Sequence, residues 1–291
     1  MYLSFYGLKE EPFRLTPDPR FIHLALPHRT ALLKLVTGIV GRKGVLVALG
    51  PVGTGKTTLL HATQHILEYK YGAGKLASAF LLNPTLGRNE LLEYILDEFE
   101  ISCTATSKPR RLLALHELLL ATHRKGSTAV LIVDEAHLLS MELLEEIRLL
   151  TNIDSYGSKL LQVVLCGQPE LATLLLKPEL KALRQRIATV AQLRSLTAAE
   201  TREYVLERLK AAGLQAAPPF TDEFYPALFR KTGGVPRLIN LACDGALAAG
   251  FKAQASRVGP ELLEAEGSVA LNLQMIEAQL ADGAVDAAES G

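Results

Sequence analysis

The amino-acid sequence predicts an α/β fold in which a parallel sheet, covered by helices on both faces, is followed by a small all-helical lid. Three observations support this prediction. Through the first two thirds of the chain, apolar runs typical of buried strands alternate with segments whose apolar residues recur at helical spacing. Two of these runs end abruptly in polar motifs, after Leu49 and after Val133. Beyond Arg194 only helical patterns remain, which favours a separate helical domain.

A strap and a lead-in helix are expected over residues 1–40. The first part is rich in aromatics and prolines, which indicates an irregular strap folded across the core, with Phe5, Phe13 and Phe21 as its anchors. From Ala31 a helical pattern leads into the first strand.

The α/β core is expected over residues 41–193. Because strand alternates with helix, the strands should be parallel, and their carboxyl ends should meet where open α/β sheets bind ligands. The expected strands are 44–50, 75–83, 130–133, 159–167 and 187–193, and the helices between them are 56–70, 88–99, 111–126 and 137–152.

The helical lid is expected over residues 194–265. Its first helix should begin at a capping box, in which Glu200 follows Thr197 by three residues, and should end at Gly213. Two prolines then break the pattern. Further helical segments follow at 221–234 and 235–251.

The chain has 291 residues, 48% of them apolar, which is enough for one large or two modest cores and excludes a disordered protein. All 31 Lys and Arg lie at or before Arg257 and seven of the 31 acids lie after it, so residues 1–257 carry 24 acids and a net charge of +7. This mild bias toward polyanions is smaller than that of a dedicated nucleic-acid-binding module. Residues 266–291 form an acidic, weakly structured tail with a helical pattern at 271–280. The tail is either a solvated end or a helix that docks a partner.

The three cysteines, Cys103, Cys166 and Cys243, lie far apart and form no C-x-x-C pair, so neither a zinc site nor a disulfide framework is expected. No apolar stretch approaches the roughly 18 residues of a membrane span. Acids at Glu10 and Glu11 replace the charged-then-apolar pattern of an export signal. We therefore expect a cytoplasmic protein that reaches a membrane only through a partner, without inserting into it.

The motif GPVGTGKT has the G-x-x-x-x-G-K-T spacing of a phosphate-binding loop between a strand and a helix. In such a loop, backbone N–H groups and the start of a helix surround the phosphates of a nucleotide. Lys56 would reach the β- and γ-phosphates, and Thr57 would ligate Mg²⁺, with Thr58 the less favoured ligand. The predicted nucleotide-binding residues of the loop are Gly50, Pro51, Val52, Gly53, Thr54, Gly55, Lys56, Thr57 and Thr58.

A carboxylate pair follows a second apolar run. Four apolar residues, 130–133, precede Asp134 and Glu135, which is typical of a parallel strand buried on both faces. Asp134 is predicted to hold Mg²⁺ at the nucleotide, directly or through water, and Glu135 to polarise the water that attacks the γ-phosphate. The alternative is that the pair caps the following helix.

Two polar residues at strand ends would complete the site. Gln168 follows a strand expected beside the two motif strands, where it would orient the attacking water. Asn83 ends another strand and would hold Glu135 in an inactive rotamer until a ligand arrives. Both residues have an alternative role as ordinary hydrogen-bonding groups at strand ends.

Three arginines are candidates for contact with the γ-phosphate. A guanidinium offered to a neighbouring subunit stabilises transition-state charge, which requires an oligomer. Arg186 is the first choice because the last strand begins directly after it, and Arg184 is the alternative. Arg237 follows Pro236 in the first turn of a lid helix, from which it would contact the γ-phosphate of its own subunit and close the lid.

Together these residues resemble an AAA+ ATPase, and in particular the general secretion pathway protein A (secretion-ATPase) family. The resemblance covers residues 1–265 and rests on FYGLKEEPFRLTPDPRFIHL, GPVGTGKTTL, LIVDEAHLL, LCGQPEL, LRQRIA and GGVPRLIN, which occur in family order. The first and fourth motifs are the most family-specific, whereas the phosphate loop alone identifies only the broad superclass. Family members typically continue into a membrane span and a peptidoglycan-binding domain. These residues contain neither, so we expect a cytosolic motor or switch.

The resemblance also implies a role for each motif residue. The implied roles are Walker A for Lys56 and Thr57, Walker B for Asp134 and Glu135, sensor 1 for Gln168, the arginine finger for Arg186 and sensor 2 for Arg237. A glutamine at sensor 1 departs from the Asn or Thr usual in AAA+ proteins.

We therefore predict an ATPase that uses ATP and Mg²⁺, releases ADP and phosphate, and assembles into a homo-oligomer in which Arg186 acts in trans. The N-terminal signature favours a protein that drives or regulates assembly of a secretion, pilus or surface-polysaccharide system through a protein partner. The alternative is an ATP-dependent regulator of transposition that binds duplex DNA and recruits a transposase, since similar ATPases do so and residues 1–257 are basic. A metabolic kinase is disfavoured because no pocket or lid residue suggests a small acceptor.

Overall fold

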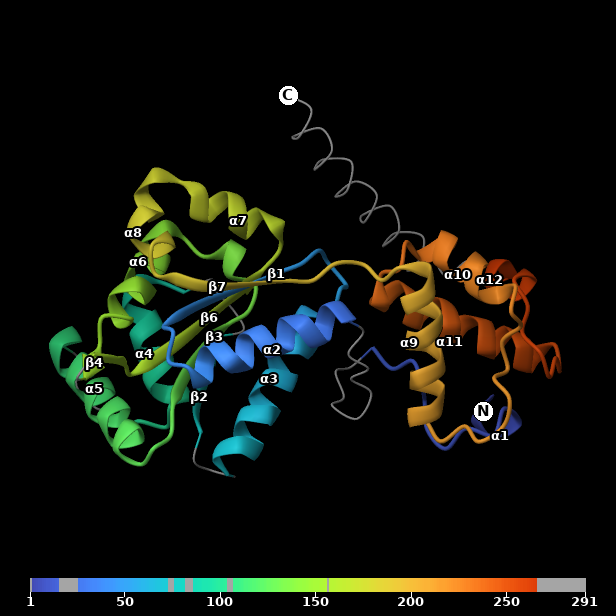
Figure 1. Cartoon of the computed structure of the whole chain (residues 1–291), viewed down its shortest axis with the longest axis horizontal. Coiled ribbons are helices and arrows are strands. Elements are labelled where there is room, and N and C mark those ends of the chain that lie inside the picture. The colour runs from blue at the N-terminus through green and yellow to red at the C-terminus, as the bar shows by residue number, and fades with distance from the viewer. Residues whose placement is uncertain are drawn as a thin grey trace. The chain divides into compact units, whose positions relative to one another are not determined.

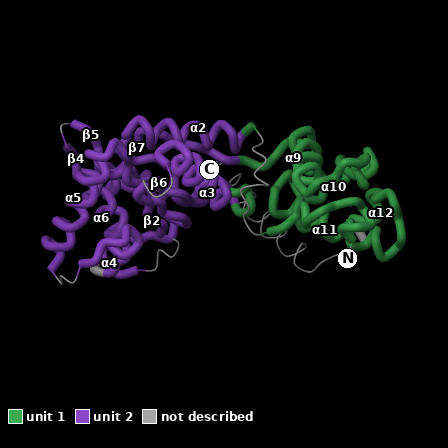
Figure 2. The backbone as a smooth tube through the Cα atoms, turned by 90° about the horizontal axis from the view of Figure 1, so that it is seen from below, with its two compact units in different colours: residues 1–26, 52–55, 194–291 green, residues 27–51, 56–193 purple. Residues whose placement is uncertain are grey.

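The computed structural model describes residues 2–15, 26–72, 76–81, 86–103, 107–155 and 157–265. The chain divides into two compact units (Figure 2). Unit 1 comprises Met1–Leu26, Val52–Gly55 and Arg194–Gly291, and unit 2 comprises Pro27–Pro51 and Lys56–Leu193.

Unit 2 is built on a five-stranded sheet in which every neighbouring pair is parallel (Figure 1). The strands stand in the order β2 (Ala77–Leu81), β3 (Ala129–Val133), β6 (Leu161–Gly167), β1 (Val45–Leu49) and β7 (Ile187–Gln192). This order places β6 between β1, which leads into the phosphate loop, and β3, which leads into Asp134. The predicted parallel α/β sheet is therefore confirmed.

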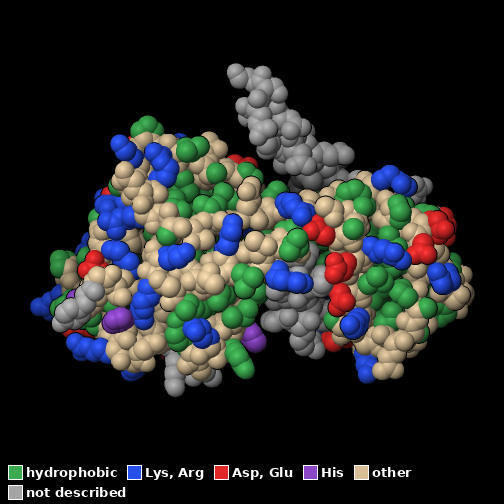
Figure 3. Space-filling view, viewed as in Figure 1, with side chains coloured by type: hydrophobic (Ala, Val, Ile, Leu, Met, Phe, Trp, Pro, Cys, Tyr) green, Lys and Arg blue, Asp and Glu red, His purple; other side chains and the backbone are tan. Residues whose placement is uncertain are grey.

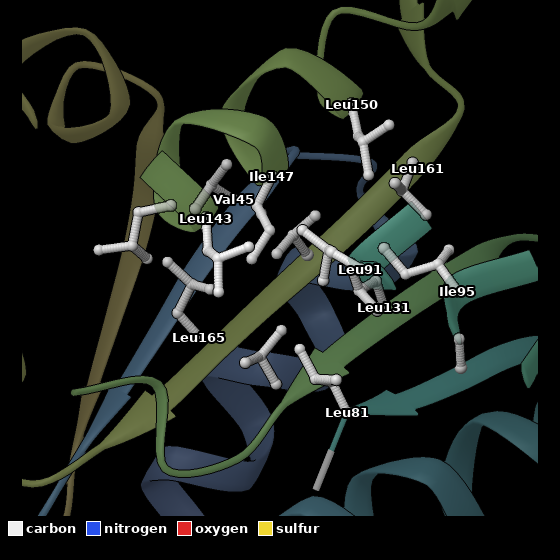
Figure 4. Packing of buried hydrophobic residues seen from close by; sticks show 14 of the residues in the cluster. Val45, Leu81, Leu91, Ile95, Leu131, Leu143, Ile147, Leu150, Leu161 and Leu165 are labelled. Carbon is white, nitrogen blue, oxygen red and sulfur yellow. The ribbon is translucent and has the colours of Figure 1, made fainter. Parts of the chain in front are cut away.

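One face of the sheet is covered by α4 (Arg88–Glu98), α5 (Lys108–Arg124) and α6 (Met141–Leu150). Alternate strand residues point into this layer, where Val45, Leu131 and Leu165 pack with leucines and isoleucines of the helices (Figure 4). Branched apolar side chains suit strands whose two faces are both buried, which explains why β3 and β6 are continuous apolar runs.

The opposite face is covered by α2 (Leu26–Val40) and α3 (Lys56–Tyr71). The backbone of Gly38 in α2 lies against the Leu46 side chain of β1. On α3, the His61 ring stacks on Phe80 of β2 with ring centroids 5.3 Å apart. Because side chains alternate along a strand, Leu46 and Phe80 point away from the α4–α6 layer, and the sheet is buried on both sides.

The remaining elements of unit 2 connect these layers. A 3₁₀ turn, η2 (Ala136–Leu138), follows β3, and α7 (Pro169–Leu176), η3 (Pro178–Leu180) and α8 (Lys181–Arg184) lie between β6 and β7. Strands β4 (Asp154–Ser155) and β5 (Ser158–Lys159) form a two-residue antiparallel pair that the sequence does not predict. Two-residue strands carry too few side chains to show a period of alternation.

Unit 1 contains α9 (Ala198–Ala211), α10 (Phe224–Thr232), α11 (Pro236–Lys252) and α12 (Glu261–Ala265), together with α1 (Tyr2–Phe5). The predicted capping box is present, since Thr197 accepts from the Glu200 N–H and Glu200 accepts from the Thr197 N–H. The core of the unit includes Phe220 and Phe224, whose rings stack with centroids 4.1 Å apart. The predicted helical C-terminal region is therefore confirmed.

The sequence predicts a strap folded across the core, and in the structure residues 2–15 of this strap pack within unit 1. Phe13 is buried against Phe220, but Phe5 is 37% exposed and contacts Phe251 by its edge. The buried Arg208 guanidinium donates to the carbonyl of Pro12 at 2.5 Å and to that of Arg14 at 3.3 Å. A buried arginine that satisfies two strap carbonyls is a long-range partner that local sequence patterns do not reveal.

Three predicted features lie outside the described residues: the anchor Phe21, the strand end Asn83 and the helical pattern at 271–280. Of the helices that the structure does describe, none combines the length and the apolar character that a bilayer span requires.

Candidate nucleotide-binding site

The phosphate loop runs from the end of β1 to the start of α3, as the motif requires. Its first residue is held by the sheet, since the Gly50 N–H donates to the carbonyl of Gly167 at 3.2 Å. Gly53 and Gly55 then take left-handed backbone angles, with φ of 74° and 92°. These angles favour glycine and turn the chain sharply into α3, whose amino end is a ready anion site.

Lys56 is the first residue of α3, and its ammonium group lies back over the loop. Its Nζ donates to the carbonyl of Pro51 at 3.2 Å, and only 7% of the residue is exposed. A lysine is rarely this buried without a partner, and here its partner within the described residues is the loop itself. The arrangement keeps one positive charge at the point where phosphates would lie.

Asp134 follows β3 and meets the start of α3. The Thr57 hydroxyl donates to Oδ2 of Asp134 at 2.7 Å, and the Glu135 N–H donates to Oδ1 at 2.9 Å. Burial raises the pKa of the neighbouring Cys166 thiol in β6, and the Asp134 carboxylate raises that pKa further. The thiol therefore stays neutral beside the carboxylate.

Glu135 has an unusual backbone conformation, with φ of 48° and ψ of 37°. Left-handed angles cost a non-glycine residue roughly 1 kcal/mol and are often found at functional sites. The pair does not cap the next long helix, because Ser140 does so by accepting from the Leu143 N–H at 3.3 Å. The alternative interpretation of Asp134 and Glu135 as the cap of that helix is therefore wrong.

Gln168 follows β6, a strand predicted to lie near the two motif strands and found between them. Its amide nitrogen lies 3.2 Å from Nε2 of His137, a residue that the sequence analysis does not assign to the site. Nδ1 of His137 in turn lies 3.4 Å from Oε2 of Glu135. The only sequence signal was the position of His137, two residues after Glu135 in the turn that follows a motif strand.

The two arginines before β7 have different surroundings. The Arg184 guanidinium donates to the carbonyl of Leu175 in the last turn of α7 at 2.9 Å. The Arg186 guanidinium donates to the Thr151 hydroxyl at 3.2 Å. Lys and Arg side chains gather on the face of unit 2 around α8 and β7 (Figure 3). Arg184 thus bonds to the backbone of α7, whereas Arg186 bonds to a side-chain hydroxyl.

Arg237 lies in the first turn of α11, after Pro236 at the position predicted for it. Arg237 is exposed. Its backbone N–H donates to the carbonyl of Gly53 at 3.2 Å, and both residues belong to unit 1. A Cβ atom at position 53 would lie 2.9 Å from the Val235 side chain. Glycine suits position 53 for two reasons: its φ is positive, and the Val235 side chain leaves no room for a Cβ atom.

The donors present suit Mg²⁺. The ion prefers oxygen ligands and is usually held by one or two carboxylates together with substrate phosphates. The Thr57 hydroxyl and the Asp134 carboxylate are such oxygens and already lie in contact at the amino end of α3.

Comparison with known proteins places this site in a family. A family model for the AAA domain matches residues 39–175. General secretion pathway protein A of Aeromonas hydrophila is 40% identical over 252 residues, which cover 86% of this chain and 45% of that protein. The chain therefore spans less than half the length of the curated relative that it matches.

Two solved structures share the fold. The ORC2 protein of Aeropyrum pernix, in its ADPNP–ADP complexes, aligns with a TM-score of 0.61 at 16% identity over 85% of this chain and 70% of that chain. The RuvB Holliday junction branch migration motor of Thermotoga maritima aligns with a TM-score of 0.56 at 18% identity over 84% of this chain and 71% of that chain. The fold, the loop geometry and the sequence match agree: the chain belongs to the AAA+ ATPases of the general secretion pathway protein A family and contains their ATPase region.

Proposed function

We propose that the chain binds ATP with Mg²⁺ and hydrolyses it to ADP and phosphate. The observation that carries this proposal is the meeting of three groups at the ends of β1 and β3: the Lys56 ammonium, the Thr57 hydroxyl and the Asp134 carboxylate. They supply a point charge for the phosphates and two oxygens for the cation.

Binding would begin at the loop. The glycine-rich turn and the amino end of α3 present N–H groups to the phosphates of ATP. Lys56 would exchange its hydrogen bond to the Pro51 carbonyl for the β- and γ-phosphate oxygens. Thr57 and Asp134 would hold Mg²⁺, which when bound neutralises charge on those oxygens. The other loop residues, and Asn83 as the sequence predicts, would line the same site.

Hydrolysis would depend on a second group of residues. Glu135 would accept a proton from the attacking water, and Gln168 would orient that water near the γ-phosphate. Arg237 would contact the γ-phosphate from the lid of the same subunit. Arg186 would stabilise the transition state in a neighbouring subunit, so full activity would require a homo-oligomer.

We further propose that hydrolysis drives or regulates assembly of a secretion, pilus or surface-polysaccharide system through a protein partner. The name of the Aeromonas hydrophila relative supports this role. Because ATP is the substrate, the ATPase region would work in the cytoplasm.

A DNA-bound regulator is the second candidate function. It is favoured by one observation, the net charge of +7 on residues 1–257. Basic surfaces bind duplex DNA with an affinity that falls steeply with salt. Such a protein would bind DNA only in its ATP-bound, oligomeric form and recruit a transposase.

The test is phosphate release from ATP by the purified chain with and without Mg²⁺, beside the Lys56→Ala variant. We expect Mg²⁺-dependent release by the wild type, and neither nucleotide binding nor release by Lys56→Ala. Light scattering with a non-hydrolysable ATP analogue should show a larger assembly. If the wild type retains no labelled ATP in the presence of Mg²⁺ and stays monomeric with the analogue, the proposed activity is wrong.

The same preparation separates the two biological roles. Duplex DNA at graded salt should show no ATP-dependent binding if the protein serves a surface-assembly system. Micromolar, ATP-dependent binding that weakens steeply with salt would instead support the DNA-bound regulator.

A further inference from the structure

Two buried polar atoms face each other beside the predicted catalytic base. Oε2 of Glu135 and Nδ1 of His137 are 3.4 Å apart, slightly beyond the usual length of a hydrogen bond. Both atoms are buried, and neither has a hydrogen-bond partner among the described residues. Buried polar atoms are nearly always paired, so this pair is poised to close by a small rotation of either side chain.

The other side of the His137 ring determines which nitrogen carries the proton. The amide nitrogen of Gln168 lies 3.2 Å from Nε2, and an amide nitrogen can only donate. With the Gln168 amide in this orientation, Nε2 accepts, and the proton of a neutral imidazole sits on Nδ1, aimed at the Glu135 carboxylate. The opposite tautomer would place a bare lone pair of Nδ1 against that carboxylate.

The backbone holds this contact in place. The turn η2 packs on the end of β6, where the His137 backbone nitrogen comes so near Gly167 that a Cβ atom there would lie 3.2 Å from it. Glu135 begins the same turn in its left-handed conformation. Three elements, the end of β3, the turn and the end of β6, therefore bring Glu135, His137 and Gln168 into one row.

We propose that His137 is a positioning residue for hydrolysis. Its Nδ1–H orients the Glu135 carboxylate, and its Nε2 couples that orientation to Gln168, the residue expected to meet the γ-phosphate. When Gln168 contacts ATP, the Gln168–His137 and His137–Glu135 contacts thereby align the Glu135 carboxylate. This inference rests on the proposed function, because it assigns His137 to the reaction in which Glu135 accepts the proton.

The kinetic test compares His137→Ala with the wild type in phosphate release and in binding of a fluorescent ATP analogue. A displaced base slows chemistry without weakening the phosphate contacts, so kcat should fall about 10- to 100-fold while the dissociation constant changes less than about twofold. The matched control is His123→Ala on α5, which removes another partly buried histidine whose Nδ1 has no hydrogen-bond partner among the described residues, and it should leave both quantities unchanged.

Two conservative variants test the two nitrogens of the His137 ring separately. The amide nitrogen of His137→Asn takes the place of Nδ1, whereas the amide of His137→Gln takes the place of Nε2. We expect His137→Asn to recover most of the kcat lost in His137→Ala, and His137→Gln to recover little. Adding Gln168→Ala to His137→Ala should lower kcat no further than the more impaired single variant, because both belong to one chain of contacts.

A readout that needs no turnover tests the geometry directly. In protein labelled with ¹⁵N-histidine, the His137 signal, identified by its loss in His137→Asn, should show the Nδ1-protonated tautomer. Gln168→Ala, which removes the amide that donates to Nε2, should shift it toward the Nε2-protonated tautomer. An Nε2-protonated His137 in the wild type, or an unchanged kcat in His137→Ala, overturns the inference.

These outcomes are distinct from failure of the proposed function. If the wild type releases no phosphate, the ATPase proposal fails, while the tautomer still decides whether His137 donates to Glu135. If the wild type hydrolyses ATP and His137→Ala loses affinity and thermal stability as much as kcat, the histidine is structural and the positioning role is wrong.

Discussion

The Thr57 hydroxyl donates a hydrogen bond of 2.7 Å to Oδ2 of Asp134, which lies 77 positions later in the chain. The contact joins the first turn of α3 to the end of β3, although β6 lies in the sheet between β3 and β1, the strand that leads into α3. It presents two oxygens of the kind that Mg²⁺ prefers.

The Thr57 and Asp134 pair predicts a metal-dependent loss of affinity. Thr57→Ala and Asp134→Asn should each weaken ATP binding in the presence of Mg²⁺ by roughly tenfold or more, because each removes an oxygen ligand or its charge. Titration of ATP with and without Mg²⁺ measures the difference. Thr57→Ser keeps the hydroxyl and should bind as the wild type does. Equal Mg²⁺ dependence in all four proteins would exclude this pair as the metal site.

Glu135→Gln should separate binding from chemistry. The amide cannot accept the proton of the attacking water, so kcat should fall roughly 10²- to 10⁴-fold. The dissociation constant for ATP should stay close to that of the wild type, and the variant should accumulate as an ATP-bound oligomer. Single-turnover phosphate release and light scattering measure the two effects. Turnover equal to that of the wild type would remove Glu135 from the mechanism.

Much of this site was predictable because each motif carries its own structural context. A loop between strand and helix, and a carboxylate after a fully apolar strand, leave few arrangements in an open parallel sheet, and Lys56, Thr57 and Asp134 lie together as that logic requires. Their functional roles stay predictions, as do the boundaries proposed for the domains.

The parts that were not predictable depend on contacts between distant residues. His137 looks like any polar residue after a strand until the sheet order brings Gln168 beside it. The aromatic residues of the strap would suit the core of either unit. In the structure the strap is bound to unit 1 by Arg208, whose guanidinium donates to the Pro12 and Arg14 carbonyls. Neither the contact between His137 and Gln168 nor that between Arg208 and the strap produces a periodic pattern in a single sequence.

Arg186 and Arg184 predict opposite phenotypes. Arg186→Ala removes a hydrogen bond to the Thr151 hydroxyl, so the fold should lose at most about 1 kcal/mol, but hydrolysis in the oligomer should fall by ~10³-fold or more. Arg184→Ala frees the Leu175 carbonyl of α7 and should lower stability by about 1 kcal/mol while sparing stimulation by assembly. ATPase rate against protein concentration, with thermal melting, checks both. Undiminished stimulation in Arg186→Ala would transfer the finger role to Arg184 or eliminate it.

Glu200 predicts a pH-dependent contribution to the stability of unit 1. Its carboxylate accepts two hydrogen bonds from Arg194 and one from the Thr197 N–H, and the Arg194 guanidinium is the main cause that lowers its pKa from 4.5 to about 2. A lowered folded-state pKa means that this stability is present above pH 4.5 and is lost as the pH falls from 4.5 toward 2. Glu200→Gln should therefore lower stability by about 1 kcal/mol at pH 7, since Arg194 is half exposed and solvent weakens the pair. Melting followed by circular dichroism at pH 7 and at pH 3 should show the gap between variant and wild type narrowing at the lower pH. Glu203→Gln, on the exposed face of the same helix, is the control, and a gap that stays constant with pH would contradict the assignment.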